Sequence, residues 1–138
     1  MSSSWLQSAV RKPDPNTGWS VFNLYDEPFF PWTVQTAAWL PGKTSEIHNH
    51  ATWGVVAVIY GQEKNIFWKR SLNSDVENAV ERVGDRILSP GDIITFVPNA
   101  IHCIETVGNE PTITFNLYGE TSHQVIYFNA IDSSNNQE

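Results

Sequence analysis

The sequence predicts an all-β fold, a single small barrel or sandwich. Turn-forming clusters such as "LPGKTS", "YGQEKN" and "SPGD" recur at intervals of about ten residues. The segments between these turns are rich in Val, Ile, Thr and aromatic residues, which favour strands. No segment of helical length with a 3.6-residue apolar period interrupts them. Many short strands at this spacing are typical of a β-sandwich or β-barrel.

Each expected strand lies between two turn signals and contains β-branched or aromatic residues. In chain order, the expected strands cover residues 19–24, 32–40, 53–60, 63–70, 79–83, 86–89, 92–97, 102–107, 112–118 and 124–128. Before the first strand, residues 1–12 are expected to form a short amphipathic helical segment, followed by the turn cluster "KPDPNTG". We therefore expect an N-terminal arm at 1–18, a barrel at 19–131 and a flexible polar tail at 132–138.

Composition narrows the class of protein. The chain has 138 residues, 41% of them hydrophobic and 17% charged, which fits one globular domain. A net charge of -7 argues against a nucleic-acid partner, which would require a basic surface. The single cysteine excludes an internal disulfide, and neither a signal peptide nor a bilayer-spanning run is evident. We expect a cytoplasmic protein with no membrane partner, either a monomer or a homodimer.

The segment "IHNH" carries two histidines, His48 and His50, at alternate positions. In an extended strand these imidazoles lie on one face, with Asn49 turned away. Two imidazoles on one face form half of a metal site, although a His-x-His pair also occurs by chance. His102, which follows the turn "VPNA", is the best candidate for a third ligand. His123, the remaining histidine, is more simply interpreted as a surface or core residue.

Around these histidines the sequence resembles the cupin superfamily, whose small β-barrels carry two characteristic motifs. The first consists of a glycine, five residues, His-x-His, three or four residues, a glutamate, six residues and a glycine. Gly42, both histidines and Gly61 match this motif, but Gly54 or Val55 stands in place of the glutamate.

The second cupin motif is matched by "GDIITFVPNAIH", through Gly91, Pro98 and His102, with Ala100 in place of a glycine. The resemblance implies a double-stranded β-helix with a metal bound by His48, His50 and His102. Without the glutamate, three neutral imidazoles leave the ion its full charge, which favours an anionic co-ligand such as a thiolate.

Among the cupins, this departure resembles the family of cysteine and 3-mercaptopropionate dioxygenases, which oxidise a thiol to a sulfinate at a three-histidine Fe(II) site. The resemblance covers roughly residues 19–119. "TITFNLYG" is similar to the family's Ser-x-His-x-Tyr segment, which implies that Tyr118 faces the substrate and that Thr114 replaces the serine. Trp39 falls where the family often has a tryptophan near the site, and Trp53 belongs to a Trp-Gly pair typical of its bacterial members.

Two positions depart from the thiol dioxygenase pattern. Asn116 stands where the family has a histidine, and an amide cannot carry a proton as imidazole does. Phe22 aligns with the arginine that holds the substrate carboxylate in the family. Either another cation serves instead, with candidates Lys64, Arg82 and Arg86, or the substrate has no carboxylate. We slightly favour the second alternative.

Three further residues near the histidines invite a chemical role but have simpler interpretations. Glu46 shares the face of His48 and is expected at the exposed rim, although a fourth ligand or an acid–base role is the alternative. Cys103 lies on the face opposite to His102 and is expected to be a small buried hydrophobe. Glu105, also opposite, is expected to be structural or exposed.

The predicted function is that of an Fe(II)-dependent dioxygenase acting on a small thiol and O2. In this interpretation Tyr118, Asn116 and Thr114 act on the substrate, which contacts Trp39, Trp53 and the wall at Phe22. Iron is the expected metal, with Mn, Ni or Zn as alternatives, because imidazole ligands accept all of them. The alternatives are another metal-dependent cupin enzyme, namely a diketone or flavonol dioxygenase, an isomerase or a lyase, and a non-catalytic binding module.

Overall fold

The computed structural model describes residues 10–25, 27–120 and 125–131, and these form an all-β fold. The strands are β1 (Trp19–Tyr25), β2 (Thr33–Trp39), β3 (Gly54–Tyr60), β4 (Gln62–Arg70), β5 (Ala79–Leu88), β6 (Ile93–Phe96), β7 (Ile101–Val107), β8 (Thr112–Tyr118) and β9 (Asn129–Ala130). The described part of the chain contains no helix that could span a membrane.

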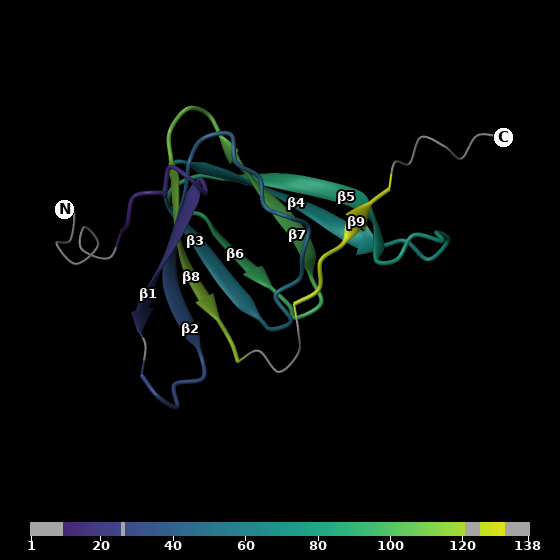
Figure 1. Ribbon diagram of the computed structural model, residues 1–138, viewed down its shortest axis with the longest axis horizontal. Coiled ribbons are helices and arrows are strands. Elements are labelled where there is room, and N and C mark those ends of the chain that lie inside the picture. The colour runs from purple at the N-terminus through teal and green to yellow at the C-terminus, as the bar shows by residue number, and fades with distance from the viewer. Residues whose placement is uncertain (1–9, 26, 121–124, 132–138) are drawn as a thin grey trace.

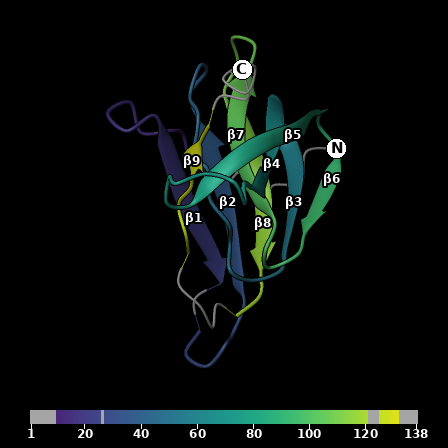
Figure 2. The same cartoon turned by 90° about the vertical axis from the view of Figure 1, so that its right-hand side faces the viewer.

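The strands form two sheets that face each other. One has the order β1-β2-β8-β3-β6 and the other the order β7-β4-β5-β9. In Figure 1 the strands of the first sheet are steeply inclined and those of the second extend toward the right, so the sheets diverge like a half-open barrel. Figure 2 shows β5 crossing in front of the five-stranded sheet. Every strand pair is antiparallel except β5 with β9, which is parallel.

The expected all-β class is confirmed, and most expected strands are present. The two strands expected at 79–83 and 86–89 are instead one strand, β5, because the expected turn between them pairs with β4 through a bulge at Phe67 and Trp68. Within the strand expected at 124–128, the described residues form only an isolated bridge, between Tyr127 and His48. The short strand β9, which follows it, pairs with β5.

The terminal segments fall almost wholly beyond what the structure describes. The helical segment expected at 1–12 lies outside the described residues except for 10–12, which have irregular structure. The tail expected at 132–138 and His123 also lie outside the described residues.

Side chains that alternate between the two faces of each strand form the interior. Val56, Val58, Leu88, Ile94 and Phe96 form one buried apolar cluster, with contributions from both sheets. A second cluster joins Val80, Ile101 and Phe128. Along β8, by contrast, the buried positions are polar: Thr112, Thr114 and Asn116 are each at most 5% exposed. Since buried polar side chains are costly unless they are used, the space between the sheets near β8 is a candidate site.

Candidate metal centre

A connecting segment and a strand bring three histidines together. Residues 40–53, between β2 and β3, lie along β7, and the backbone N–H groups of His48 and His102 each donate to the other residue's carbonyl, at 2.9 and 3.0 Å. Asn49 anchors the same segment on its other side, since its buried side-chain oxygen accepts from the backbone N–H of Ile126 at 3.0 Å. One ligand nitrogen from each of His48, His50 and His102 lies within 4.8 Å of the others.

Hydrogen bonds to the outer ring nitrogens orient two of the imidazoles. His48 donates from Nδ1 to the backbone carbonyl of Glu46 at 2.7 Å. His102 donates from Nδ1 to the side-chain oxygen of Asn65 at 2.9 Å. Because Nδ1 carries the proton in both rings, each Nε2 keeps its lone pair for a metal ion.

Electrostatics keep the cluster neutral. Burial lowers the pKa of His48, and burial together with the neighbouring His48 lowers the pKa of His50 to about 4. Burial, reinforced by both other histidines, also lowers the pKa of His102 well below its usual value. The three rings are therefore neutral at pH 7, which is the form that binds metal.

A hydrogen-bonded relay extends from His102 to a buried acid. Asn65 accepts from His102 through Oδ1 and donates from Nδ2 to Glu63 Oε1 at 2.9 Å. Glu63 is 3% exposed, Asn65 1% and His102 3%. Burial raises the pKa of Glu63, and the hydrogen bond from Asn65 offsets this in part. The relay fixes the orientation of a candidate ligand, as outer-shell groups do in metal sites.

Sequence reasoning missed both Glu63 and Asn65. The signal was present in the two-residue alternation of β4, which places them on the inward face with Phe67, whereas Lys64 lies on the other face. The acid absent from the first motif therefore has a counterpart from another strand. Glu63 lines the same cavity as the three histidines, but it is not one of the three candidate metal ligands.

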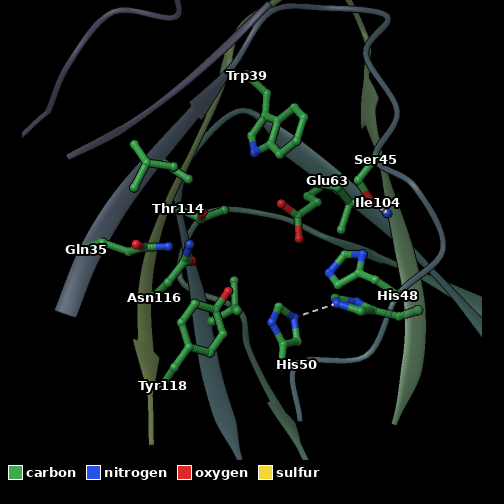
Figure 3. A pocket seen from close by; sticks show the side chains of 14 residues that line it. Gln35, Trp39, Ser45, His48, His50, Glu63, Ile104, Thr114, Asn116 and Tyr118 are labelled. Atoms are coloured by element: carbon green, nitrogen blue, oxygen red, sulfur yellow. Dashed lines mark hydrogen bonds between the residues drawn. The ribbon is translucent and has the colours of Figure 1, made fainter. Parts of the chain in front are cut away.

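Strand β8 forms the opposite wall. Thr114, Asn116 and Tyr118, at alternate positions, all line the cavity that contains the histidines (Figure 3). The Tyr118 ring stacks on His50, with centroids 4.6 Å apart and an angle of 22° between the planes. Burial and, to a smaller extent, Glu63 raise the pKa of Tyr118, so its hydroxyl keeps its proton at neutral pH. Asn116 Oδ1 is fully buried and has no hydrogen-bond partner among the described residues.

The structure explains why glycine occupies position 54. Gly54 pairs with Tyr118 across β3 and β8, and a Cβ atom there would lie 2.9 Å from Tyr118 Cδ1. A glutamate at this position would displace the ring that stacks on His50. Gly54 and the position of Tyr118 are thus two sides of one packing arrangement.

The other expected site residues are distributed as follows. Trp39 lines the cavity, but Trp53 does not and packs edge-on against Trp32 at 5.7 Å. Val21 rather than Phe22 faces the cavity, because successive residues of β1 point to opposite sides, and Phe22 lies under the guanidinium of Arg11 at 4.5 Å.

None of the three cations considered for a substrate carboxylate lines the cavity. Lys64 pairs with Glu105 at 3.7 Å and Arg82 with Asp85, while Arg86 is exposed. Glu46 is exposed at the rim.

Cys103 is buried, as expected, with its sulfur accepting from the Trp68 indole at 3.3 Å.

Two adjoining cavities lead to the histidines. The inner one, of about 150 Å³, lies between the sheets and is shown in Figure 3. The outer one, of about 490 Å³, is lined by Trp19, Lys43, Glu46 and Tyr127 among others. Trp39, Ser45 and His48 line both. The inner space therefore suits a small molecule, and the outer one supplies a route to it.

Known structures share this architecture. An oxalate oxidase in complex with the substrate analogue glycolate superimposes with a TM-score of 0.63 at 18% identity, over 91% of this chain and 62% of the oxidase. The chain has the cupin double-stranded β-helix fold. An uncharacterised double-stranded β-helix protein from Klebsiella pneumoniae matches with a TM-score of 0.62 at 17% identity, over 90% of this chain and 94% of that one.

A third cupin neighbour is a sugar phosphate isomerase from Silicibacter pomeroyi, with a TM-score of 0.59 at 19% identity. It matches over 76% of this chain and 61% of its own length. This chain thus spans about three fifths of the length of the oxidase and of the isomerase. No family model matches the sequence.

The three histidines fit a divalent metal ion. Nε2 of His50 and Nε2 of His102 are 2.8 Å apart, close to the spacing of two imidazole ligands on one ion with metal–nitrogen bonds of about 2.0–2.1 Å. The lone pairs of neutral rings repel at this distance unless a proton or a cation lies between them. A metal site of three imidazoles is therefore the chemistry that this cluster supports.

Proposed function

We propose that the protein is an Fe(II)-dependent dioxygenase that oxidises a small thiol to a sulfinate. The observation that carries this proposal is a neutral three-histidine cluster whose ligand set contains no carboxylate, in one cavity with a protonated tyrosine hydroxyl. An ion held by His48, His50 and His102 would supply a binding place for a thiolate and for O2, and would activate both. Both oxygen atoms end on the sulfur, so the thiolate and O2 give the sulfinate without a further reductant.

The residues of the chain have distinct tasks in this reaction. Tyr118 keeps its proton and lines the cavity, so its hydroxyl would donate a hydrogen bond to the substrate where negative charge develops on oxygen. The stacking of Tyr118 on His50 holds the hydroxyl in place relative to the cluster. Asn116 contributes an amide that orients the substrate but moves no proton, since it replaces the family's histidine. Apolar walls at Val21, Ala37 and Val56 keep the space dry.

The test is anaerobic reconstitution with Fe(II), followed by O2 uptake with cysteine, cysteamine, 3-mercaptopropionate and mercaptosuccinate. We expect uptake with at least one thiol and a sulfinate product that contains both atoms of labelled O2. Tyr118→Phe should retain iron but react more slowly by about 10²–10⁴-fold, the range typical of a group that assists in the transition state. Absence of uptake with every thiol, from protein shown to contain iron, would exclude the proposal.

A second candidate is a metal-dependent isomerase or lyase, and Glu63 favours it. A buried carboxyl with a raised pKa beside a metal cluster is suited to moving a proton without O2. One cupin neighbour is named as a sugar phosphate isomerase. Activity that persists under strict anaerobiosis, with Mn, Ni or Zn in the purified protein, would favour this candidate over the first.

A further inference from the structure

Among the described residues that line the inner cavity, one is acidic and none is a lysine or an arginine. Glu63 supplies its carboxyl, and neither a lysine nor an arginine contributes to its wall. Lys43 lines only the outer cavity, where it stands with the acidic Glu46. A substrate carboxylate in the inner cavity would thus meet the Glu63 carboxyl without a lysine or arginine beside it, which is costly in a dry site.

One oxygen of the Glu63 carboxyl is engaged by a neighbouring side chain. Oε1 accepts from Asn65 Nδ2 at 2.9 Å, and Glu63 lines the inner cavity. Figure 3 shows the carboxyl pointing into the cavity, between the histidines and the strand that carries Thr114 and Asn116. Glu63 is only 3% exposed, so bulk water has little access to its carboxyl group.

Asn116 provides a second, independent observation from the other sheet. Its side chain is 95% buried, since only 5% is exposed, and its Oδ1 accepts no hydrogen bond from a described residue. Buried amide oxygens without a partner are rare in native proteins, and a ligand that donates to Asn116 Oδ1 would complete its hydrogen bonding. Glu63 and Asn116 therefore present acceptor oxygens on facing walls of one small cavity, and that of Asn116 has no partner among the described residues.

On the basis of the proposed function, we propose that the substrate is an aminothiol without a carboxylate, whose ammonium group lies between Glu63 and Asn116. An ammonium has three donors and a positive charge, so it pairs with the Glu63 carboxylate and with the Asn116 oxygen at once. A hydroxyl would satisfy one acceptor and leave the charge of Glu63 unpaired. Glu63 is then the residue that determines specificity, in place of the arginine that a carboxylate substrate requires.

The test measures binding rather than turnover. The full chain is loaded with Co(II) and titrated without O2 with three thiols of similar size: 2-aminoethanethiol, 2-mercaptoethanol and 3-mercaptopropionate. Binding is followed by the thiolate–cobalt absorption band. We expect the aminothiol to bind about 10-fold or more tightly than the hydroxythiol, as a charge-assisted hydrogen bond provides, and the carboxylate to bind most weakly.

Two variants and one control identify the cause. Glu63→Gln keeps the acceptor for Asn65 and should reduce the preference for the amine to less than about 2-fold. Asn116→Leu should weaken aminothiol binding by several-fold without changing cobalt affinity. Glu105→Gln, on β7 and outside the cavity, should leave all three affinities unchanged. Equal affinities for the three thiols in the parent protein, or a preference that survives Glu63→Gln, would overturn the inference.

A second readout separates this inference from the proposed function. Ethylamine and ethanol are compared for their effect on the melting temperature of the protein without thiol. If no thiol produces the cobalt band, thiol chemistry fails. Stabilisation by ethylamine that disappears in Glu63→Gln would still support an amine site. A loss of cobalt affinity in Glu63→Gln with the amine preference intact would assign Glu63 to the support of His102 alone, and would contradict the inference.

Discussion

Strands β4 and β8 both direct polar side chains into the cavity, but the two sets of side chains differ in their hydrogen bonding. On β4, both the Nδ2 and the Oδ1 of Asn65 form hydrogen bonds, which link Glu63 to His102. On β8, Asn116 is similarly buried, but its Oδ1 has no partner among the described residues. One wall is thus organised in advance around a metal ligand, and the other is left open. The difference separates groups that build the site from groups that await a ligand.

Removing a histidine from the organised wall should have the largest effect. His102→Ala removes a ligand and also leaves Asn65 without its donor. Metal affinity should fall by more than the about 10–100-fold typical of outer-shell changes. The measurement is metal content after dialysis, with Glu105→Gln on the same strand as the control. Unchanged metal content in His102→Ala would show that the metal does not bind at this cluster.

Matched amide substitutions on the two walls compare them directly. Asn65→Leu leaves Glu63 Oε1 and His102 Nδ1 buried without partners, so the free energy of unfolding should fall by about 1–3 kcal/mol for each group. Asn116→Leu removes a buried acceptor that has no partner and should be neutral or slightly stabilising. Urea denaturation of both variants gives the two values. Equal losses of stability would mean that the Asn116 side chain is hydrogen-bonded as completely as that of Asn65.

A smaller effect is expected from filling the space beside Tyr118. In Gly54→Ala the new methyl group meets the Tyr118 ring, which must shift from His50, at a cost of about 1–3 kcal/mol in the free energy of unfolding. On β5, a methyl group added at Gly84 would have no atom within 4 Å, so Gly84→Ala should be neutral or stabilising by about 0.5–1 kcal/mol. Thermal denaturation compares the pair, and a Gly54→Ala protein as stable as the parent would contradict the packing argument.

The pH dependence of stability should reveal the opposite signs of the two kinds of buried group. For the metal-free protein, the pKa values of the three histidines are lowered by folding, so the unfolded chain binds more protons and stability falls as pH drops below about 6.5. Folding raises the pKa of Glu63. Its contribution to the free energy of unfolding is therefore present at low pH and is lost as the pH rises through the raised pKa.

His50→Gln provides the check on this sign. With the pKa of His50 lowered to about 4, its replacement should flatten the loss of stability between about pH 6.5 and 4. The measurement is the free energy of unfolding from urea titrations across this range. A parent protein whose stability stays level or rises as the pH falls through this window would contradict the assignment of buried neutral rings.

Much of the fold and part of the site followed from local pattern. Alternating segments between turns predicted most strands because a half-buried strand repeats every two residues. The spacing in "IHNH" and the place of His102 predicted a cluster that the structure brings within 4.8 Å. The turn expected at 83–86 was wrong. These residues favour a turn in isolation, but in the fold β5 continues through them because it pairs with β4.

The sequence by itself determined the all-β class, the alternate histidines His48 and His50 and the three inward positions of β8, since each depends on residues close together in the chain. Only the tertiary structure decided which side of β1 faces the cavity and which acid stands beside the metal ligands. Glu63 and Asn65 reach His102 because Phe67 on β4 pairs with His102 on β7. Such a register joins residues far apart in sequence, so no local motif encodes it, and it is fixed by which faces of the two sheets are buried together.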